Sequence, residues 1–132
     1  MRLLAFLAAL YVVPGAQGQV ITCPRSSSIE RTECLEKNLQ SARAELQRVY
    51  GAAIAGIHSK DNDYIPKPEL DKWKVEAEKA QRAWQAYRDI ECETIVPYQW
   101  WGGSGAGGAS LECSLQKTVA RIQELKSAYR VK

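Results

Sequence analysis

Residues 80–92 have the sequence AQRAWQAYRDIEC, and this stretch decides how we interpret the rest of the chain. No Pro or Gly interrupts it, and it is rich in Ala, Gln, Glu and Arg, so it favours an α-helix. Trp84 and Tyr87 are three residues apart and therefore share one helical face. We interpret the stretch as the C-terminal half of a core helix, in which the two aromatic side chains supply apolar area.

The same helix extends upstream to about Pro68, because Pro suits the first turn of a helix. Its apolar positions recur every three or four residues: Leu70, Trp73, Ala77, Ala80, Trp84 and Tyr87. We expect the helix to end between Cys92 and Ile95, because Pro97 follows.

Two other segments have helical periodicity. The first helix is expected to run from about Ser27, which with Glu30 fits a capping box, to about Ile57. Its apolar seam is Leu35, Leu39, Ala42, Leu46, Val49 and Ala53. A coiled coil is the competing interpretation, but the seam is short and aromatic residues follow it, which favours a compact bundle. The last helix is expected over residues 110–129, and the residues on its apolar face are Leu111, Leu115, Thr118, Ile122, Leu125 and Tyr129.

The connections between these helices are polar or rich in glycine. The first contains Asp61-Asn62-Asp63, which is no calcium loop because the glycine and the later glutamate of that motif are missing. The second is residues 102–109, in which five of eight residues are Gly, so we expect it to be flexible. No Gly-Lys-Ser/Thr sequence closes that tract, which excludes a phosphate-binding loop.

The N-terminal segment is typical of a secretory signal peptide. Arg2 is followed by the apolar run of residues 3–13 and by small residues at Ala16 and Gly18. We therefore expect residues 1–18 to be a signal peptide and residues 19–132 to be the mature domain. A retained anchor helix is the alternative, although the run is too short to span a bilayer, and so is lipidation of Cys23, for which the preceding Thr22 fits poorly.

Charge gives little indication of the partner. The formal net charge is +3, and the leader holds one Arg and no acid, so the mature chain carries +2. Nucleic-acid-binding proteins usually show a strong basic patch, so this charge argues against a nucleic-acid partner. We expect no stable membrane insertion of the mature chain.

The cysteines predict disulfide bonds in an oxidising compartment. An even number of cysteines follows the leader: Cys23, Cys34, Cys92 and Cys113. No Cys-x-x-Cys pair is present and His58 is the sole histidine, so we expect neither a metal site nor a cofactor. Sequence alone leaves three pairings open. We favour Cys92–Cys113, which closes the glycine-rich loop, and Cys23–Cys34, which pins the lead-in segment to the first helix.

Together these patterns predict an all-α fold. Three helices joined by loops should pack antiparallel, so the expected architecture is an antiparallel three-helix bundle with two disulfides at one end. Such bonds stabilise small domains by roughly 2–4 kcal/mol each.

No set of side chains predicts catalysis. A nucleophile with a base is missing, because His58 stands alone and no free thiol is expected. Glu30 with Glu33 and Glu91 with Glu93 are carboxylate pairs, but solvated helix flanks explain them better than glycosidase chemistry. We therefore expect no enzyme and no catalytic residue.

Two groups of residues are candidates for other roles. Beside the aromatic pair Trp84 and Tyr87, Arg88 and Asp89 are expected to form a structural ion pair, because a half-buried Arg must be paired. The partner-binding candidates are the aromatic residues and the start of the glycine tract: Tyr98, Trp100, Trp101, Gly102, Gly103 and Ser104. Trp and Tyr are preferred anchors of protein interfaces. The alternative is that these aromatic side chains fold back over the open end of the bundle.

Several motifs combine into a family resemblance over roughly Cys23 to Tyr129. They are Cys34-Leu35, Leu39, Ala44-Glu45-Leu46, Val49-Tyr50, Gln81-Arg82-Ala83-Trp84, Tyr87-Arg88-Asp89, Cys92, Gly102-Gly103-Ser104, Cys113, Thr118, Arg121 and Leu125. This combination resembles the lysozyme-inhibitor LprI-like family of small exported bacterial proteins. The resemblance implies a periplasmic or secreted inhibitor whose partner is lysozyme.

Three hypotheses remain open at this stage. The first is an exported monomer that binds and inhibits a cell-wall hydrolase such as lysozyme, and we favour it. The second is a structural or stress-related envelope protein with a different protein partner. The third is an enzyme acting on envelope glycans or peptides. Lysozymes are usually strongly basic, so a mildly basic inhibitor gains no long-range attraction unless acidic residues gather locally.

Overall fold

The computed structural model describes residues 22–23, 27–59 and 64–132. The expected signal peptide, residues 1–18, and the Asp61-Asn62-Asp63 turn lie outside the described residues. The described chain forms α1 (Ser28–His58), α2 (Lys67–Asp89), the π-helical segment η1 (Ile90–Ile95), α3 (Val96–Gln99) and α4 (Ala106–Tyr129). These elements are helical, and two disulfides join parts of the chain, so the all-α prediction with two disulfides is confirmed.

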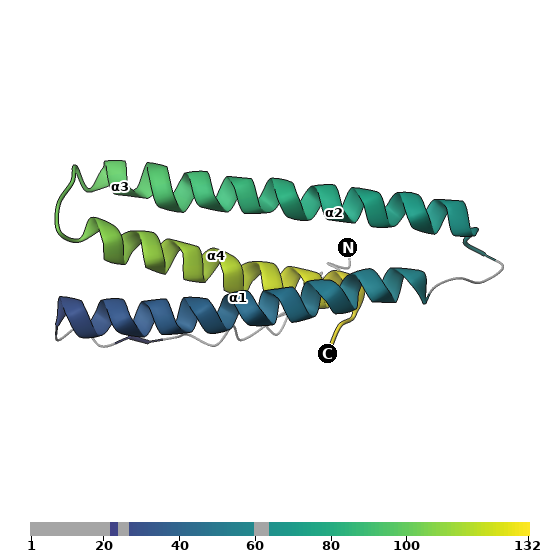
Figure 1. The fold of residues 1–132 in the computed structure, drawn as a ribbon, viewed down its shortest axis with the longest axis horizontal. Helices are drawn as coiled ribbons and strands as arrows, with labels where there is room; N and C mark the ends of the chain where they lie inside the picture. Colours follow the sequence, from purple (N-terminus) through teal and green to yellow (C-terminus); the bar gives the residue numbers. More distant parts are fainter. Residues whose placement is uncertain (1–21, 24–26, 60–63) are drawn as a thin grey trace, which may run out of the picture.

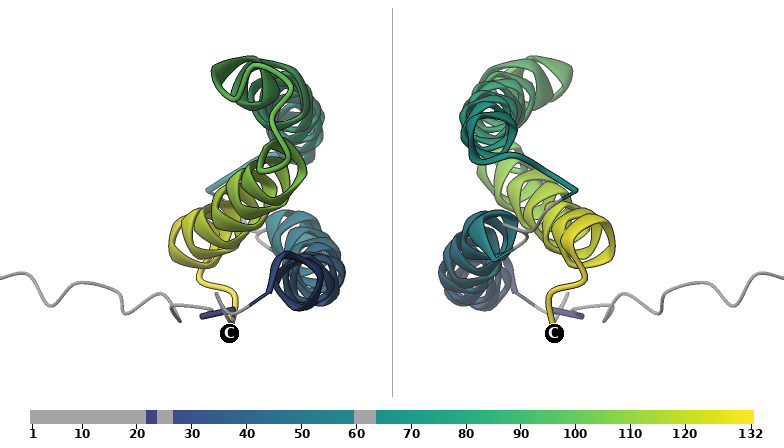
Figure 2. Two further views of the ribbon diagram at one scale, coloured as in Figure 1. Left: turned by 90° about the vertical axis from the view of Figure 1, so that its left-hand side faces the viewer. Right: turned by 90° about the vertical axis from the view of Figure 1, so that its right-hand side faces the viewer.

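The long helices lie side by side. In Figure 1 the chain runs from left to right along α1, returns along α2, and runs left to right again along α4. The end-on views of Figure 2 show α4 between α1 and α2. Among the described residues, no helix combines the length and the apolar character needed to cross a membrane.

The apolar core lies between α1 and α4. The side chains that form it are Leu35, Leu39, Ala42, Leu46, Val49, Leu115, Ile122 and Leu125. The expected seams of the first and last helices are therefore confirmed, and Val49 and Thr118 are fully buried. At the start of α1, the hydroxyl of Ser27 accepts a hydrogen bond from the backbone N–H of Glu30 (3.0 Å), as a serine N-cap should.

The prediction that α2 is a core helix is confirmed for Trp84, which packs against the core cluster, but not for Tyr87 or for most of the helix. Its buried residues are only Leu70, Gln81 and Arg88, and two of these are polar. Trp84 is half-buried, whereas Tyr87 is 54% exposed. The reason is that the faces of α1 and α4 already cover each other, so α2 packs on the outside of a completed two-helix core.

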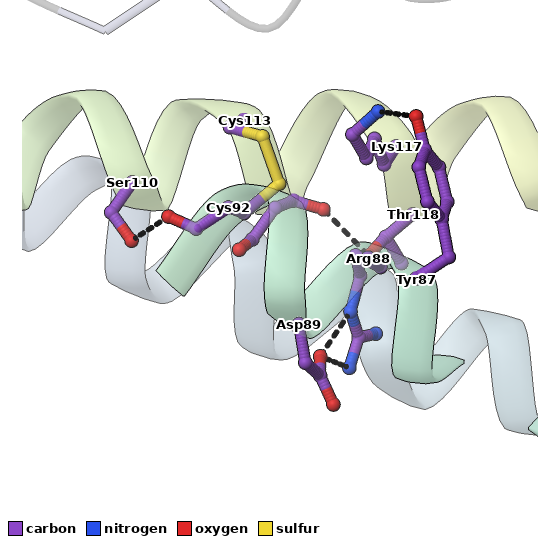
Figure 3. The surroundings of a disulfide bond; sticks show 9 residues. Tyr87, Arg88, Asp89, Cys92, Ser110, Cys113, Lys117 and Thr118 are labelled. Carbon is purple, nitrogen blue, oxygen red and sulfur yellow. Dashed lines mark hydrogen bonds and ion pairs between the residues drawn. A yellow bond between two sulfur atoms is a disulfide. The ribbon is translucent and has the colours of Figure 1, made fainter. Parts of the chain in front are cut away.

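The expected end of this helix before Pro97 is also wrong, because the backbone stays helical to Gln99. A proline cannot donate a backbone hydrogen bond, and here the helix widens into η1 just before it. The Val96 N–H bonds to the Glu91 carbonyl, five residues back. In the same pattern the Cys92 carbonyl would accept from residue 97, but Pro97 has no N–H to donate. The Ser110 hydroxyl donates to that carbonyl instead (2.7 Å), as Figure 3 shows.

The last helix begins earlier than expected. Its first residue is Ala106, so Gly107 and Gly108 of the glycine tract are helical. Two backbone bonds start it, from the Ala106 N–H to the Gly103 carbonyl (3.0 Å) and from the Ala109 N–H to the Gly105 carbonyl (3.0 Å). The tract is therefore part loop and part helix, and only its first half connects α3 to α4.

Candidate functional site

The connection between α3 and α4 is a series of overlapping turns. The Trp100 N–H bonds to the Pro97 carbonyl (3.1 Å), and the Gly103 N–H bonds to the Trp100 carbonyl (2.8 Å). Trp101 has φ = 47° and Gly102 has φ = 72°, so two successive residues adopt left-handed conformations. Glycine accepts this conformation without steric cost, whereas a tryptophan does so rarely. We call residues 100–105 the aromatic loop.

The aromatic side chains beside this loop differ in exposure. Trp101 is 95% exposed, Tyr98 is 76% exposed and Trp100 is 48% exposed. The Trp100 ring lies over Gly105, where a Cβ atom would meet the ring Cζ3 at 2.2 Å. Trp100 therefore packs onto its own loop, while Trp101 and Tyr98 face solvent. The remaining partner-binding candidates, Gly102, Gly103 and Ser104, are exposed.

A small cleft separates the aromatic loop from the start of α1. Its volume is about 340 Å³, and its lining includes Trp100, Ser104 and Glu112. Arg31 of α1 crosses to Glu112 of α4 with an N–O distance of 2.6 Å, which ties the two helices together at this cleft.

The disulfides have the favoured pairing, Cys23–Cys34 and Cys92–Cys113. The second joins η1 to α4 with a Cα–Cα distance of 5.4 Å, and Cys92 is completely buried. Figure 3 shows this bond beside the hydrogen bond from Ser110 to the Cys92 carbonyl. The two segments that flank α3 and the aromatic loop, η1 before them and α4 after them, are thus joined to each other.

The expected Arg88–Asp89 pair forms in the structure. The guanidinium donates through Nε (2.9 Å) and a terminal nitrogen (2.7 Å) to Oδ1 of Asp89, and Arg88 is only 9% exposed. Its Cζ atom lies 5.2 Å from the centroid of the Trp84 ring, within cation–π distance. This geometry supports a structural role for Arg88, which stays a prediction.

Cationic side chains of α4 attach α2 to the core, and the sequence reasoning missed them. Lys117 Nζ donates to the Tyr87 hydroxyl (2.9 Å) and lies 4.5 Å from the centroid of that ring (Figure 3). Arg121 Nε donates to Gln81 Oε1 (3.0 Å). The available signal was the spacing of Lys117 and Arg121, which are four residues apart and so share one face of α4.

A larger cleft of about 590 Å³ lies between α1 and α2. Its charged lining residues include three cations and three acids: Arg43, Arg82, Arg88, Glu78, Asp89 and Glu93. These charges balance, so the cleft has no net preference for an anion or a cation. Within the described residues, no group of three His, Cys, Asp or Glu side chains is placed to hold a metal ion.

One carboxyl group away from the aromatic loop is strongly perturbed. Hydrogen bonds from Arg48 and Lys126 lower the pKa of Glu45 from 4.5 to about 2. The larger contribution comes from Arg48 within α1, and the Glu45–Lys126 pair (2.9 Å) joins α1 to α4, so only part of this shift reports an interhelical contact.

Charge is distributed unevenly along the last third of the chain. Residues 89–116, which contain η1, α3 and the aromatic loop, include four acids and no Lys or Arg. Residues 117–132 include five Lys or Arg residues and one acid. The small net charge therefore conceals an acidic segment around the loop, which the sequence reasoning considered but did not locate.

Comparisons with known proteins identify the family. An uncharacterised protein of Rhizobium meliloti (strain 1021) is 31% identical over 101 residues, covering 76% of this chain and 72% of that protein. The uncharacterised protein YecT of Escherichia coli (strain K12) is 33% identical over 63 residues, covering 48% of this chain and 38% of YecT. No solved structure matches the chain. A family model described as lysozyme inhibitor LprI matches residues 23–125, which include all four cysteines. The chain therefore belongs to the lysozyme inhibitor LprI family.

Proposed function

We propose that this protein is an exported inhibitor that binds a lysozyme-type cell-wall hydrolase through the aromatic loop. In this proposal residues 1–18 direct export and are removed, and residues 19–132 act in the bacterial periplasm or outside the cell. The working form is a monomeric antiparallel three-helix bundle, fastened at one end by both disulfides, without enzymatic activity. Family membership supports an inhibitor role, and the disulfides are consistent with an oxidising compartment.

The observation that carries the proposal is the exposure of Trp101. A tryptophan that is 95% exposed buries almost none of its large apolar surface within the domain. Its left-handed backbone (φ = 47°) is costly for a residue with a side chain, so the fold holds it there against a local preference. Such a side chain contributes nothing to the core but is well suited to enter the cleft of a partner.

The local charge removes the electrostatic objection to a basic target. Glu91 and Glu93 form no ion pair with any residue that the structure describes, and no Lys or Arg lies in residues 89–116. Asp89 and Glu112 are paired with Arg88 and Arg31, so a basic hydrolase would meet the two remaining carboxylates, on η1, although the whole chain is slightly basic.

The test is inhibition of a c-type lysozyme that clears a suspension of bacterial cell walls. The full chain is expressed with its own leader into an oxidising compartment and purified with its disulfides formed. We expect the wild type to slow clearing in proportion to its concentration. Trp101→Ala should raise the concentration needed for half-inhibition at least about tenfold, because an anchoring aromatic residue carries much of an interface. No inhibition by wild type at high concentration would contradict the proposal.

A matched control distinguishes loss of contact from loss of fold. Tyr64→Ala removes an aromatic side chain that is 92% exposed, in the connection before α2. We expect this variant to inhibit as the wild type does. Trp101→Ala should also keep the wild-type unfolding midpoint, because the deleted side chain is almost fully exposed.

The second candidate function is a structural or stress-related envelope protein with another protein partner. The observation that favours it is the basic C-terminal end, where the side chains of Arg130 and Lys132 form no ion pair with any residue that the structure describes. The other cations of residues 117–132, Lys117, Arg121 and Lys126, are engaged within the molecule. Recovery of one periplasmic partner by the immobilised wild type, together with no binding of lysozyme, would select this function.

A further inference from the structure

A row of apolar side chains faces solvent along the end of α2, η1 and α3. The larger members of the row are 42–76% exposed, and we call them the outer strip: Tyr87, Ile90, Ile95 and Tyr98. Two smaller apolar residues of α2, Ala83 and Ala86, are exposed beside it. Contiguous exposed apolar surface is unusual on a small exported domain and commonly marks an interaction site.

The π-helical segment explains why these residues share a face. Arg88, Cys92 and Val96 point toward the rest of the molecule, since the first two are buried and the third is half-buried. Each follows the previous one by four residues, and in an α-helix four residues turn the direction of the side chain by about 40° beyond a full turn. The wider turn of η1 reduces this rotation, so the inward direction changes little from Arg88 to Val96. Ile90 follows Arg88 by two residues and Tyr98 follows Val96 by two residues, so both stay on the opposite side of the helix.

The strip is held rigidly from behind. The Cys92–Cys113 disulfide and the hydrogen bond from Ser110 to the Cys92 carbonyl fix η1 on α4, as Figure 3 shows. Tyr87 of α2 is held as well, because Lys117 of α4 donates a hydrogen bond to its hydroxyl. A surface that is ordered before binding loses little conformational entropy when a partner docks.

The outer strip is continuous with the aromatic loop. The Trp101 N–H bonds to the Tyr98 carbonyl (3.2 Å), so the loop continues the last turn of α3. Two charged side chains adjoin the strip: Glu91, which follows Ile90 and is half-buried, and Lys117 of α4, which lies over the Tyr87 ring, whereas Glu93 lines the cleft between α1 and α2. The combined surface is therefore apolar, with Lys117 at its α2 end and an acidic margin at Glu91, and this margin matches a lysine or arginine at the rim of an apolar cleft.

We propose that the outer strip and the aromatic loop form one docking surface, whose occupant is the basic cell-wall hydrolase itself. This inference rests on the proposed function and extends it, because it adds the outer strip to the contact that the aromatic loop makes with the hydrolase. The loop enters the cleft of the hydrolase, and the strip lies along the wall beside that cleft. The acidic margin faces basic residues of the hydrolase and favours its approach.

The test measures the dissociation constant for c-type lysozyme by calorimetry, using the full chain expressed with its leader. Ile90→Lys replaces an exposed apolar residue by a cation, and we expect it to raise the dissociation constant at least about tenfold. Tyr98→Ala should have an effect of similar size. Val75→Lys is the matched control, because Val75 is also exposed (46%) on α2 but lies outside the strip, and its dissociation constant should stay within about twofold of wild type.

Each outcome decides the matter. If the wild type binds and Trp101→Ala weakens binding, but Ile90→Lys and Tyr98→Ala bind as the wild type does, the strip is not a contact and only the proposed function survives. If the wild type does not bind lysozyme, both proposals are overturned. If sedimentation shows a wild-type dimer that Ile90→Lys converts to a monomer, the strip joins two copies of this chain and the inference is also overturned.

Discussion

Replacing Gly105 by alanine should displace the ring of Trp100 and loosen the aromatic loop. A Cβ atom at this position would lie 2.2 Å from Cζ3, 2.7 Å from Cε3 and 2.8 Å from Cη2 of Trp100. No real Cβ atom approaches a ring so closely, so the ring must move. The backbone itself is no obstacle, because Gly105 has φ = −81° and ψ = −12°, which alanine adopts readily.

The expected magnitude follows from the surface that Trp100 buries. Trp100 is 48% exposed, and a tryptophan buries at most about 250 Å², so about 130 Å² is covered here. At about 25 cal/mol per Å² this burial contributes at most about 3 kcal/mol. The alanine restores about 0.4–1 kcal/mol by restricting the unfolded chain. We therefore expect the free energy of unfolding to fall by about 2 kcal/mol, which corresponds to a Tm lower by about 8 °C.

The assay is urea unfolding followed by tryptophan fluorescence, with Gly107→Ala as the matched control. Gly107 lies in the first turn of α4, and no atom lies within 4 Å of a Cβ at this position. Its alanine variant should be more stable than wild type by up to about 1 kcal/mol. If Gly105→Ala is as stable as Gly107→Ala, Trp100 does not rest on Gly105 and the described loop geometry is incorrect.

Three further predictions concern the contacts that hold the helices together. Removing one disulfide with Cys92→Ala and Cys113→Ala should lower the free energy of unfolding by about 3 kcal/mol, because the bond closes a loop with a sequence separation of 21; a loss below about 1 kcal/mol in urea unfolding would contradict this. Ser110→Ala should cost about 1–2 kcal/mol by leaving a carbonyl of η1 without its donor, whereas the exposed Ser41→Ala serves as a control and should cost almost nothing. Glu45 has a pKa of about 2 instead of 4.5, so its contribution is complete above about pH 4.5 and is lost as the pH falls toward 2; Glu45→Gln should flatten the stability profile in that window, and an unchanged slope in acid titrations would refute the assignment.

The buried faces of α1 and α4 were predictable because both helices have a regular apolar seam, although the same periodicity in α2 hid the fact that α1 and α4 share the core. Leucine or another aliphatic residue recurs every three or four positions in each, and these residues form the core. The serine cap of α1 also followed from a local rule, the Ser27–Glu30 spacing, whereas the sequence left three disulfide pairings open and the structure has the favoured one.

The position of α2 was not predictable from its own sequence. Trp84 and Tyr87 are large apolar residues at helical spacing, which is a pattern typical of a core face. An aromatic ring can equally be covered by a cation, and here Arg88, Lys117 and Arg121 lie over the two rings. Periodicity does not distinguish these two environments, because it records which residues share a face and not what covers that face.

The aromatic loop was predicted as a candidate, but its geometry was not. The sequence shows tryptophans beside glycines, which leaves open whether the rings cover the bundle or face solvent. The structure has one ring in each environment. The Trp100 ring packs over Gly105, whereas Trp101, with its left-handed backbone, faces solvent. The π-helical turn was also missed, since it depends on a contact between Ser110 and the Cys92 carbonyl that no local pattern indicates.

The Cys92–Cys113 bond contributes to the attachment of the proposed docking surface. The apolar core joins α1 to α4, whereas α2 buries one apolar residue, Leu70, and otherwise relies on polar, aromatic and cation–π contacts. The end of α2 that leads to the aromatic loop is fixed to α4 by the Cys92–Cys113 bond. Reduction of that bond would leave the two-helix core intact, and η1 would then be held on α4 by the Ser110 hydrogen bond and, through Tyr87, by Lys117. In the proposed function, oxidation of the cysteines therefore strengthens the attachment of the docking surface to α4, which suits an inhibitor that acts in an oxidising compartment.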